Sequence, residues 1–433
     1  MDKIAKKINI ITLGCSKNLV DSEQFAAQAL ESGFTVVHNS SELDSQIAVV
    51  NTCGFINDAK EESINMILQL ANLKVEKKLE KIIVFGCLAE RYMNELKKEI
   101  PEVDVFIGNY NVQELLDNLE IDFHSEAKYN RVFDSPGHYA YLKIAEGCNR
   151  KCAFCAIPSI KGKYISRHFN DIVEEARDLA SVGVKEIILI AQDLSYYGYD
   201  IDKEFLLPDL VEEISRIEGV EWIRLHYLYP FLFPEKLLEV MKNNPKVCKY
   251  VDIPLQHISD RVLKAMNRGG TKEQTLNLLS KMKEYLPEAS FRTTMLVGHP
   301  EETEADFEEL LKFVAEFKFE KLGVFTYSEE DGTIAAEKFS DSISQEIKDE
   351  RAENLMGVQR EVSEELNQLK IGIVVKVIVD AVNGDRYVGR TEFDSVEVDG
   401  EVLFTSDKEL KPGDFCDVEI LSSDEYDLFG KKI

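Results

Sequence analysis

The chain has 433 residues, a length that suits about three domains. Its residues are 44% hydrophobic and 30% charged, as in globular proteins that bury sizeable cores. The 79 acidic residues outnumber the 51 basic ones and give a net charge of −28, which excludes a generic nucleic-acid binder because phosphate contacts require a basic face.

No apolar run approaches the ~20 residues that a membrane helix needs. The first ten residues, MDKIAKKINI, also lack the apolar stretch of a signal peptide. We therefore expect a cytoplasmic protein with no membrane partner. In that compartment the eight cysteines are expected to serve as metal ligands or catalytic thiols rather than as disulfides.

Residues 1–121 alternate short apolar runs with helical patterns, which predicts an N-terminal parallel α/β sheet domain. A helix is expected over residues 21–32, because it would end before Gly33. The expected strands are residues 8–13, 47–51, 81–85 and 105–107. Residues 122–139 have weak periodicity and contain Pro136 and Gly137, so we expect a linker there.

A second series of strands and helices runs through residues 140–343 and predicts a partial (βα)6 barrel, in which chemistry belongs to the loops after the strands. The expected strands are residues 141–145, 186–191, 222–226, 250–253, 291–296 and 321–325.

Residues 344–369 predict one long acidic connecting helix that tolerates Gly357. Residues 370–433 change to short alternating runs with turn signals, which predicts a small antiparallel β-barrel. The expected strands and turns of this barrel are residues 374–379, 383–384, 396–398, 411–413 and 416–421.

The strongest motif is a C-x3-C-x2-C run formed by Cys148, Cys152 and Cys155, just after the first strand of the second series. Three thiolates in a short loop can hold three irons of a cubic cluster and leave the fourth iron open to a small molecule. The alternatives are a zinc site completed by a distant residue such as His168, or cysteines that only pack.

A second set of thiols is distributed over the N-terminal domain. Cys15, Cys53 and Cys87 each lie about two residues beyond an expected strand. Because the ends of parallel strands share one edge of the sheet, these thiols could converge on a second cluster. Any one of them alone would be read as a buried packing residue, which is how we interpret Cys248 and Cys416.

The charge reverses around the compact motif. Residues 143–168 contain six basic residues against one acidic residue, Glu146. The basic residues are Lys143, Arg150, Lys151, Lys161, Lys163 and Arg167. They could offset the charge of a thiolate-ligated cluster, or bind an anionic group such as a cofactor carboxylate or an acidic substrate side chain.

Together these features resemble the radical S-adenosylmethionine (SAM) methylthiotransferases, and the resemblance covers essentially the whole chain. It implies two 4Fe–4S clusters and identifies the C-terminal barrel with the family's TRAM domain. The implied ligands of the radical SAM cluster are Cys148, Cys152 and Cys155. The implied ligands of the auxiliary cluster are Cys15, Cys53 and Cys87.

One branch of the family modifies an aspartate of ribosomal protein S-twelve in the small subunit, and another modifies adenosine in transfer RNA. Segments 141–148, 156–163, 191–193 and 252–257 resemble the protein-modifying branch. Glu146-Gly147 stands where transfer-RNA members typically have Arg-Gly, and Gln192-Asp193 where they tend to have Gln-Asn. The chain departs from the family at His299 and Glu301, where Gly-Phe-Pro-Gly-Glu-Thr is usual.

The implied reaction uses SAM twice, because an unactivated aspartate Cβ–H requires cofactor chemistry. One SAM donates a methyl group to sulfur at the auxiliary cluster. A second is reductively cleaved to a 5′-deoxyadenosyl radical that removes the aspartate hydrogen. The implied partners are S-twelve or the small ribosomal subunit, an electron donor such as a flavodoxin or ferredoxin, and a sulfur donor. The two cluster sites would have to face a shared cavity.

Three residues are expected SAM contacts: Phe154 on the adenine, and Gln192 and Arg292 at barrel strands. Their alternatives are hydrophobic packing for Phe154, a strand-end hydrogen bond for Gln192, and an ion pair such as one with Glu302 for Arg292.

Two rival functions are a transfer-RNA methylthiotransferase and a two-cluster electron carrier. The C-terminal barrel argues against the first, because residues 370–433 carry 8 basic and 15 acidic residues whereas an RNA-binding barrel should be basic. The three-cysteine sets argue against the second, because carriers are usually compact and ligate each cluster fully with cysteine.

Overall fold

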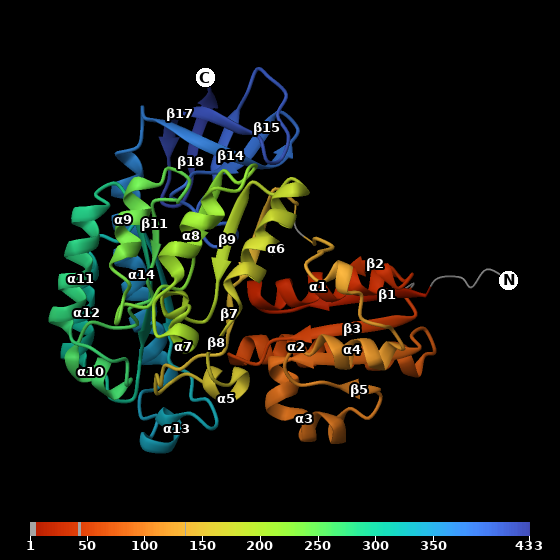
Figure 1. Ribbon diagram of the computed structural model, residues 1–433. Helices are drawn as coiled ribbons and strands as arrows, with labels where there is room; N and C mark the ends of the chain where they lie inside the picture. Colours follow the sequence, from red (N-terminus) through yellow and green to blue (C-terminus); the bar gives the residue numbers. More distant parts are fainter. Residues whose placement is uncertain (1–5, 42–44, 135) are drawn as a thin grey trace. The chain divides into compact units, whose positions relative to one another are not determined.

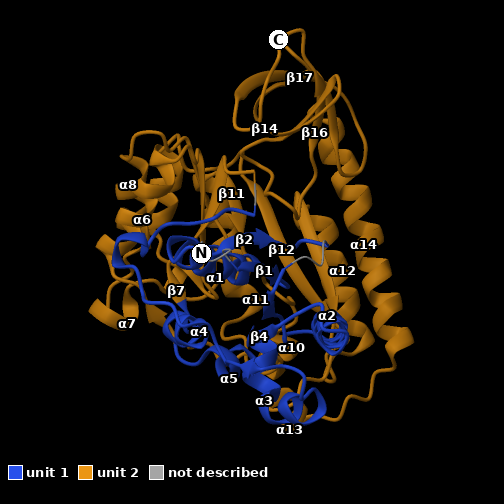
Figure 2. Ribbon diagram, turned by 90° about the vertical axis from the view of Figure 1, so that its right-hand side faces the viewer, with its two compact units in different colours: residues 1–135, 146–148, 156–163 blue, residues 136–145, 149–155, 164–433 orange. Residues whose placement is uncertain are grey.

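The computed structural model describes residues 6–41, 45–134 and 136–433 (Figure 1). Two earlier predictions fall partly outside the described residues. They concern the first five residues of the segment interpreted as lacking a signal peptide, and Ser135 of the expected linker. The chain forms two compact units (Figure 2). The first unit is residues 1–135, 146–148 and 156–163, and the second is residues 136–145, 149–155 and 164–433.

The first unit contains a five-stranded parallel sheet in the order β2-β1-β3-β4-β5. Its strands are β1 (Lys7–Thr12), β2 (Thr35–His38), β3 (Ile47–Thr52), β4 (Lys81–Gly86) and β5 (Val105–Phe106). Its helices are α1 (Ser16–Glu31), α2 (Asn57–Val75), α3 (Cys87–Glu99), α4 (Val112–Leu119) and the 3-10 turn η1 (Ser125–Ala127). The prediction of a parallel α/β sheet domain is confirmed.

Both faces of this sheet are covered because successive strand residues point to opposite sides. Ile8 and Ile10 of β1 pack in one apolar cluster with residues of α1 and α4. Ile82 and Val84 of β4 pack in another with residues of α2 and α3. The sheet therefore has the two-sided burial typical of parallel α/β proteins.

Two details of the prediction were wrong. Helix α1 begins at Ser16, five residues before the expected start, because its first turns bury polar residues such as Asn18 and Asp21, which hide the apolar periodicity. Strand β2 was not expected, since it is a four-residue edge strand whose residues are only partly buried.

The second unit contains all six strands that the second series predicted. They are β6 (Tyr139–Lys143), β9 (Glu186–Ile190), β10 (Trp222–Leu225), β11 (Tyr250–Asp252), β12 (Ser290–Val297) and β13 (Lys321–Thr326). The long helices among them are α6 (Phe169–Ser181), α8 (Leu207–Ser215), α9 (Lys236–Asn243), α11 (Lys272–Tyr285) and α12 (Glu304–Phe317). The shorter elements of this unit are β8 (Ile165–Ser166), η2 (Leu194–Tyr196), α7 (Tyr199–Asp202), α10 (Asp260–Ala265) and α13 (Ile334–Lys338). Two further short elements follow β6 in the chain: α5 (Ile157–Lys161) belongs to the first unit, and β7 (Ala145–Glu146) has one residue in each unit.

The six strands are hydrogen-bonded as two parallel sheets of three, β10-β9-β6 and β11-β12-β13. At the seam between them, Ile223 of β10 donates to Lys246 O at 2.7 Å and accepts from Cys248 N at 2.9 Å. Leu228 N, just after β10, also donates to Asp252 O of β11 at 2.9 Å. The two sheets are thus joined by a short bridge at Ile223 and by this further hydrogen bond rather than by a full strand ladder.

Helix α14 (Gln345–Gln368) leads into a closed five-stranded barrel in the order β14-β15-β16-β18-β17. Its strands are β14 (Val374–Asn383), β15 (Arg386–Arg390), β16 (Val402–Thr405), β17 (Phe415–Ser423) and β18 (Leu428–Lys432). The prediction of a small C-terminal barrel is confirmed, but one of its pairs, β16 with β18, is parallel.

The expected strand over residues 396–398 was wrong. Those residues form turns, and the strand begins only at Val402. Neighbouring side chains instead reach the partial barrel: Ser395 lies 2.8 Å from His226, and Asp399 accepts from the Tyr250 hydroxyl at 2.7 Å. Of the two valines that form the apolar alternation, Val396 is buried and Val398 is exposed, so the segment does not have the burial pattern of a strand.

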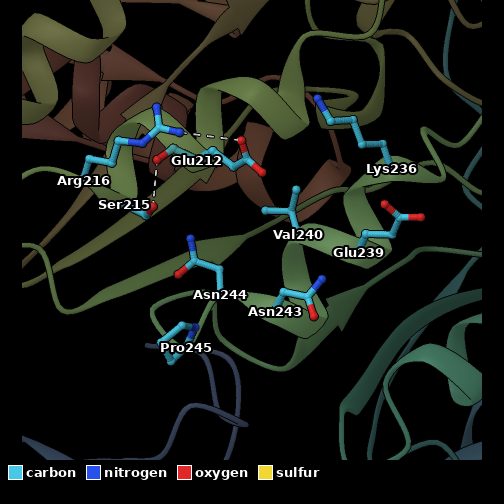
Figure 3. A pocket seen from close by; sticks show the side chains of 9 residues that line it. All are labelled: Glu212, Ser215, Arg216, Lys236, Glu239, Val240, Asn243, Asn244 and Pro245. Carbon is cyan, nitrogen blue, oxygen red and sulfur yellow. Dashed lines mark hydrogen bonds and ion pairs between the residues drawn. The ribbon is translucent and has the colours of Figure 1, made fainter.

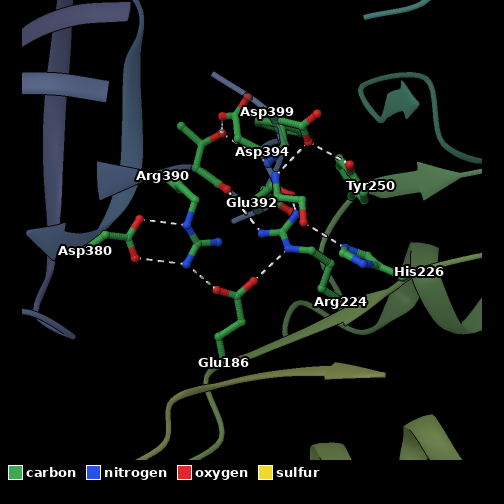
Figure 4. A network of polar contacts seen from close by, with 12 residues as sticks. Glu186, Arg224, His226, Tyr250, Asp380, Arg390, Glu392, Asp394 and Asp399 are labelled. Atoms are coloured by element: carbon green, nitrogen blue, oxygen red, sulfur yellow. Dashed lines mark hydrogen bonds and ion pairs between the residues drawn. The ribbon is translucent and has the colours of Figure 1, made fainter. Parts of the chain in front are cut away.

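Within the second unit, the C-terminal barrel packs against the N-terminal ends of the parallel strands (Figure 4). Glu186, the first residue of β9, accepts from Arg224 of β10 at 2.7 Å and from Arg390 of β15 at 2.8 Å. Arg390 also pairs with Asp380 of β14, which contacts His138 at 2.7 Å. We call Glu186, Arg224, Arg390, Asp380 and His138 the ionic junction. The opposite, C-terminal ends of the strands precede the loops expected to carry the chemistry.

Among the described residues, no helix has both the length and the apolar character needed to cross a membrane.

Candidate active site

Three cysteines of the first unit lie where the sequence predicted them, directly after parallel strands. Cys15 follows β1 and immediately precedes α1, Cys53 follows β3, and Cys87 is the first residue of α3 after β4. Because β1, β3 and β4 are neighbours in the sheet, all three belong to one edge. Cys15 is exposed, Cys53 is half-buried and Cys87 is buried.

The loops that carry these thiols are closely packed. Gly14 has φ of +94°, and a Cβ on it would lie only 2.6 Å from Cys53 Cβ. Glycine is therefore required beside Cys15 for both its backbone conformation and the close approach of the next loop.

Burial makes the thiolate form of these cysteines costly. It raises the pKa of Cys53, and it raises the pKa of Cys87 to about 12, with only Lys161 opposing it strongly. The negative charges of Cys15 and Cys53 would raise the pKa of Cys87 further, which shows that the three groups lie within electrostatic range. A coordinated metal supplies the positive charge that such thiolates need, so this donor set fits an iron–sulfur cluster.

The compact motif is divided between the two units. Cys148 belongs to the first unit, where it is half-buried and its N–H donates to Gly162 O at 3.1 Å. Cys152 and Cys155 belong to the second unit and share a turn, in which Cys155 N donates to Cys152 O at 3.1 Å. Cys152 is buried, and Arg268 Nη1 donates to its sulfur at 3.2 Å.

No three His, Cys, Asp or Glu side chains within the described ranges are arranged as a ready-formed metal site. The two ligand sets therefore stay predictions that rest on donor chemistry and placement. His168, considered as a zinc ligand, is exposed and immediately precedes α6. Cys248 and Cys416 are buried in apolar clusters, as expected for packing residues.

The three expected SAM contacts lie in different surroundings. Phe154 packs against an apolar cluster that includes Met266 and Tyr327. Gln192 is half-buried in the loop after β9. Arg292 lies near the start of β12, where its guanidinium is 3.1 Å from Asp252 and 3.5 Å from Asp399.

The alternative that paired Arg292 with Glu302 was wrong in its partner, because Glu302 lies 2.8 Å from Arg351.

The basic residues around the motif are largely engaged with acidic neighbours. Arg150 lies 2.7 Å from Asp193, Arg167 lies 2.6 Å from Glu175, and Lys161 lies 3.6 Å from Glu146. These internal pairs leave less positive charge for a thiolate-ligated cluster or for a bound anion, and they do not distinguish the two interpretations.

Sequence reasoning missed the side chains around Cys152. The guanidinium of Arg150 stacks 4.0 Å from the Tyr229 ring centroid, and that of Arg268 lies 4.3 Å from it. The available signal was an arginine directly before Gly269 and Gly270, in the segment that connects β11 to α11. Loops at that end of the strands are where ligands bind in such barrels.

His299, the departure from the family pattern, is an aromatic packing residue. It is fully buried, with ring centroids 5.4 Å from Tyr327 and 5.5 Å from Phe339. Burial lowers the pKa of His299 to about 4, so the ring is neutral at physiological pH. It can therefore occupy an apolar position where the family usually has phenylalanine.

A surface cavity of about 500 Å³ lies between α8 and α9, and its lining includes Glu212, Arg216, Lys236 and Glu239 (Figure 3). None of the cysteines or expected SAM contacts lines it. This cavity is therefore separate from the candidate active site.

Three family models match the chain in succession. Residues 7–108 match the Uncharacterized protein family UPF0004, residues 142–314 match the Radical SAM superfamily, and residues 371–433 match the TRAM domain.

Curated relatives match over nearly the full length. The ribosomal protein uS12 methylthiotransferase RimO of Bacteroides thetaiotaomicron is 54% identical over 427 residues, 98% of each chain. The protein of the same name from Christiangramia forsetii is 49% identical over 428 residues, which cover 99% of this chain and 94% of that one.

Solved structures share the fold at low identity. The radical S-adenosylmethionine methyltransferase TsrM from Kitasatospora setae, with cobalamin and a [4Fe-4S] cluster bound, has a TM-score of 0.53 and 14% identity and covers 75% of each chain. The cobalamin-dependent S-adenosylmethionine radical enzyme OxsB has a TM-score of 0.52 and 11% identity, covering 82% of this chain and 56% of that one.

The partial barrel with its three-cysteine loop and the Radical SAM match define this chain as a radical SAM enzyme. Its cofactors are S-adenosylmethionine and two 4Fe–4S clusters. The sequence identity over nearly the full length identifies the family within this class: the chain belongs to the ribosomal protein uS12 methylthiotransferase family.

Proposed function

We propose that this enzyme transfers a methylthio group to the β-carbon of an aspartate in ribosomal protein uS12, the S-twelve protein of the small subunit. SAM serves as both methyl donor and radical source. The observation that carries the proposal is the 54% identity to uS12 methylthiotransferases over 98% of the chain. The distribution of six cysteines over two sets at strand ends supports it.

The chain's own residues would provide two thiolate sites. Cys148, Cys152 and Cys155 would hold the cluster that binds SAM, and the auxiliary cluster ligands would be Cys15, Cys53 and Cys87. When bound, the clusters and SAM supply one-electron cleavage and a radical able to remove hydrogen from an unactivated carbon. The burial of Cys152 and Cys87 would keep water away from that chemistry.

For SAM we propose contacts from Phe154 and Gln192, which lie in the cysteine loop and in the loop after β9. Arg292 remains the third proposed contact, and its ion pairs with Asp252 and Asp399 support the alternative of a structural role. For the domains we propose residues 1–121, 140–343 and 370–433, joined by the linker 122–139 and the helical segment 344–369.

We also propose the remaining partners. A cluster that cleaves SAM needs a low-potential electron donor of the flavodoxin or ferredoxin class, and the methylthio group needs a sulfur donor. We place the reaction in the cytoplasm, where newly made ribosomal protein is available.

The test is to incubate the reconstituted enzyme with SAM, a reductant and either uS12 or small ribosomal subunits. We expect a mass gain of one methylthio group on an aspartate of uS12, measured by peptide mass spectrometry. Modified transfer RNA together with unmodified uS12 would overturn the proposal.

Two cysteine variants serve as a matched pair in that assay. Cys152→Ala should abolish formation of 5′-deoxyadenosine, because it removes a ligand of the cluster that binds SAM. Cys248→Ala, at a buried cysteine in an apolar cluster, should retain it.

The transfer-RNA alternative is not favoured. The C-terminal barrel carries 8 basic and 15 acidic residues, so it lacks the basic face that holds a nucleic-acid backbone. The electron-carrier alternative is excluded by membership of the methylthiotransferase family.

A further inference from the structure

A three-residue turn in the second unit is bonded residue by residue to the cysteine loop. The turn is Met266-Asn267-Arg268, directly after α10, and we call it the clamp turn. Met266 O accepts from Ala153 N at 2.7 Å, and Asn267 Nδ2 donates to Lys151 O at 2.6 Å. Arg268 Nη1 donates to Cys152 Sγ at 3.2 Å. The clamp turn therefore fixes the backbone on both sides of Cys152.

Arg268 is the only charged residue of this turn, and it is 7% exposed. Its Nη2 donates to Pro254 O, and its Nε has no hydrogen-bond partner among the described residues. Its backbone carbonyl accepts from the Tyr229 hydroxyl, and its guanidinium lies against the Tyr229 ring.

No carboxylate in the described part of the chain forms an ion pair with Arg268. The nearby Asp193 pairs with Arg150 at 2.7 Å. A buried guanidinium without a counter-charge is costly, so a buried arginine normally has an anionic partner. Among the described residues, the Arg268 guanidinium donates hydrogen bonds to Cys152 Sγ and to Pro254 O, which is a neutral carbonyl. Of these two acceptors, the Cys152 sulfur is the one that becomes anionic, when it ligates iron.

We propose that Arg268 is a positioning residue that raises the reduction potential of the cluster held by Cys148, Cys152 and Cys155. The inference rests on the proposed function, which places a cluster at those thiols. Reduction adds one electron, taken from the low-potential donor, to an already negative centre. A fixed positive charge and a hydrogen bond to a ligand sulfur both stabilise that added charge, and both are recognised controls of iron–sulfur potentials.

The geometry explains why this residue is an arginine. Arginine keeps its charge at any physiological pH and presents several donors in one plane, so it can hold Cys152 and Pro254 together. Lysine would keep the charge but could not make both contacts from a planar fork. Glutamine would keep one donor and lose the charge.

The experiment is a redox titration of the reconstituted holoenzyme, followed by electron paramagnetic resonance with and without SAM. The cluster whose spectrum responds to SAM is the one observed. In Arg268→Gln, the ratio of reduced to oxidised cluster at a fixed potential should fall about tenfold, a shift of about 59 mV to lower potential for a one-electron couple. Arg268→Lys should recover most of the loss.

Asn267→Gly is the matched control. Asn267 has φ of +50°, which glycine adopts freely, and the change removes the hydrogen bond to Lys151 O without altering charge. It should leave the potential unchanged. Iron content is measured for every variant, so that loss of the cluster is distinguished from a shift in its potential.

An Arg268→Gln enzyme with full iron content and an unchanged potential would overturn the inference while leaving the proposed function intact. Loss of iron from both Arg268 variants would also overturn it, because the side chain would then serve the loop's structure alone. A wild-type enzyme with no SAM-responsive cluster would overturn the proposed function and this inference with it.

Discussion

Glu186 is a completely buried carboxylate held between two guanidinium groups. It accepts from Arg224 at 2.7 Å and from Arg390 at 2.8 Å, and these contacts outweigh burial and lower its pKa to about 2. Removing one partner of a buried ionic group is destabilising because the remaining charges lose their compensation. Glu186 therefore contributes stability only while it is ionised.

We predict that Glu186→Gln lowers the free energy of unfolding by about 3 kcal/mol at neutral pH. Because the folded-state pKa lies below the ordinary value of 4.5, the contribution of Glu186 is complete above that value and is lost as pH falls towards about 2. The difference between wild type and variant should shrink over this interval. Urea unfolding at several pH values measures it.

Glu212→Gln is the control for that series. Glu212 is a surface residue near Arg216, at a distance of 3.9 Å, and an exposed pair contributes little. A pH-independent gap between wild type and Glu186→Gln would contradict the role assigned to the buried charge.

The sequence predicted the cysteines of the candidate site but not the side chains around them. The six thiols could be placed because each follows a strand that its own apolar run reveals. Arg268 could not be paired with Cys152, since 116 residues separate them and only the folded barrel brings their loops together. The same holds for the hydrogen bond between Tyr250 and Asp399, which are 149 residues apart.

Helix α14 contains a glycine at a position that does not require one. Gly357 lies in the middle of the helix, and a Cβ there would meet nothing within 4 Å. Glycine in a helix interior costs about 1 kcal/mol relative to alanine, mainly through the freedom that it keeps in the unfolded chain.

We therefore predict that Gly357→Ala raises the free energy of unfolding by about 1 kcal/mol, measured by urea denaturation. Gly372, shortly after the same helix, is the matched control. A Cβ on it would also meet no atom within 4 Å, but its φ is +84°, so Gly372→Ala should destabilise. Equal effects of the two changes would contradict this explanation.

Helices and strands with strong apolar periodicity were predicted well. Short strands, and helical turns that bury polar residues, were not. All six strands of the partial barrel were recognised because each contains an apolar run and is followed by a helix, even β13, whose residues are only partly buried or exposed. The seam between β10 and β11 was not recognised, since it consists of a short bridge at Ile223 and a hydrogen bond from Leu228 N to Asp252 O that no local pattern reveals. The start of α1 was misplaced because polar residues are buried there.

For the whole molecule, the net charge of −28 bears on the choice of partner. An acidic enzyme attracts a basic ribosomal protein at long range, and salt screens that attraction over about 10 Å at 0.1 M ionic strength. This attraction changes the rate at which enzyme and substrate associate rather than the rate of the chemical step.

We predict that KM for free uS12 rises several-fold as ionic strength is raised from low salt to about 0.15 M, while kcat changes little. Steady-state kinetics with mass-spectrometric detection of modified uS12 would measure both constants. A KM independent of salt would show that the charge of the enzyme plays no part in recruiting this substrate.

The ionic junction also limits how the enzyme can be recombined. A chimera that grafted a foreign β-barrel after α14 would leave Glu186 and Arg224 facing a surface without Arg390 and its partner Asp380. The foreign barrel would have to carry an arginine and an aspartate at the positions of Arg390 and Asp380. Otherwise Glu186 and Arg224 would have to be replaced in the rest of the enzyme. The C-terminal barrel is therefore specific to the partial barrel of this enzyme and cannot be exchanged as an independent domain.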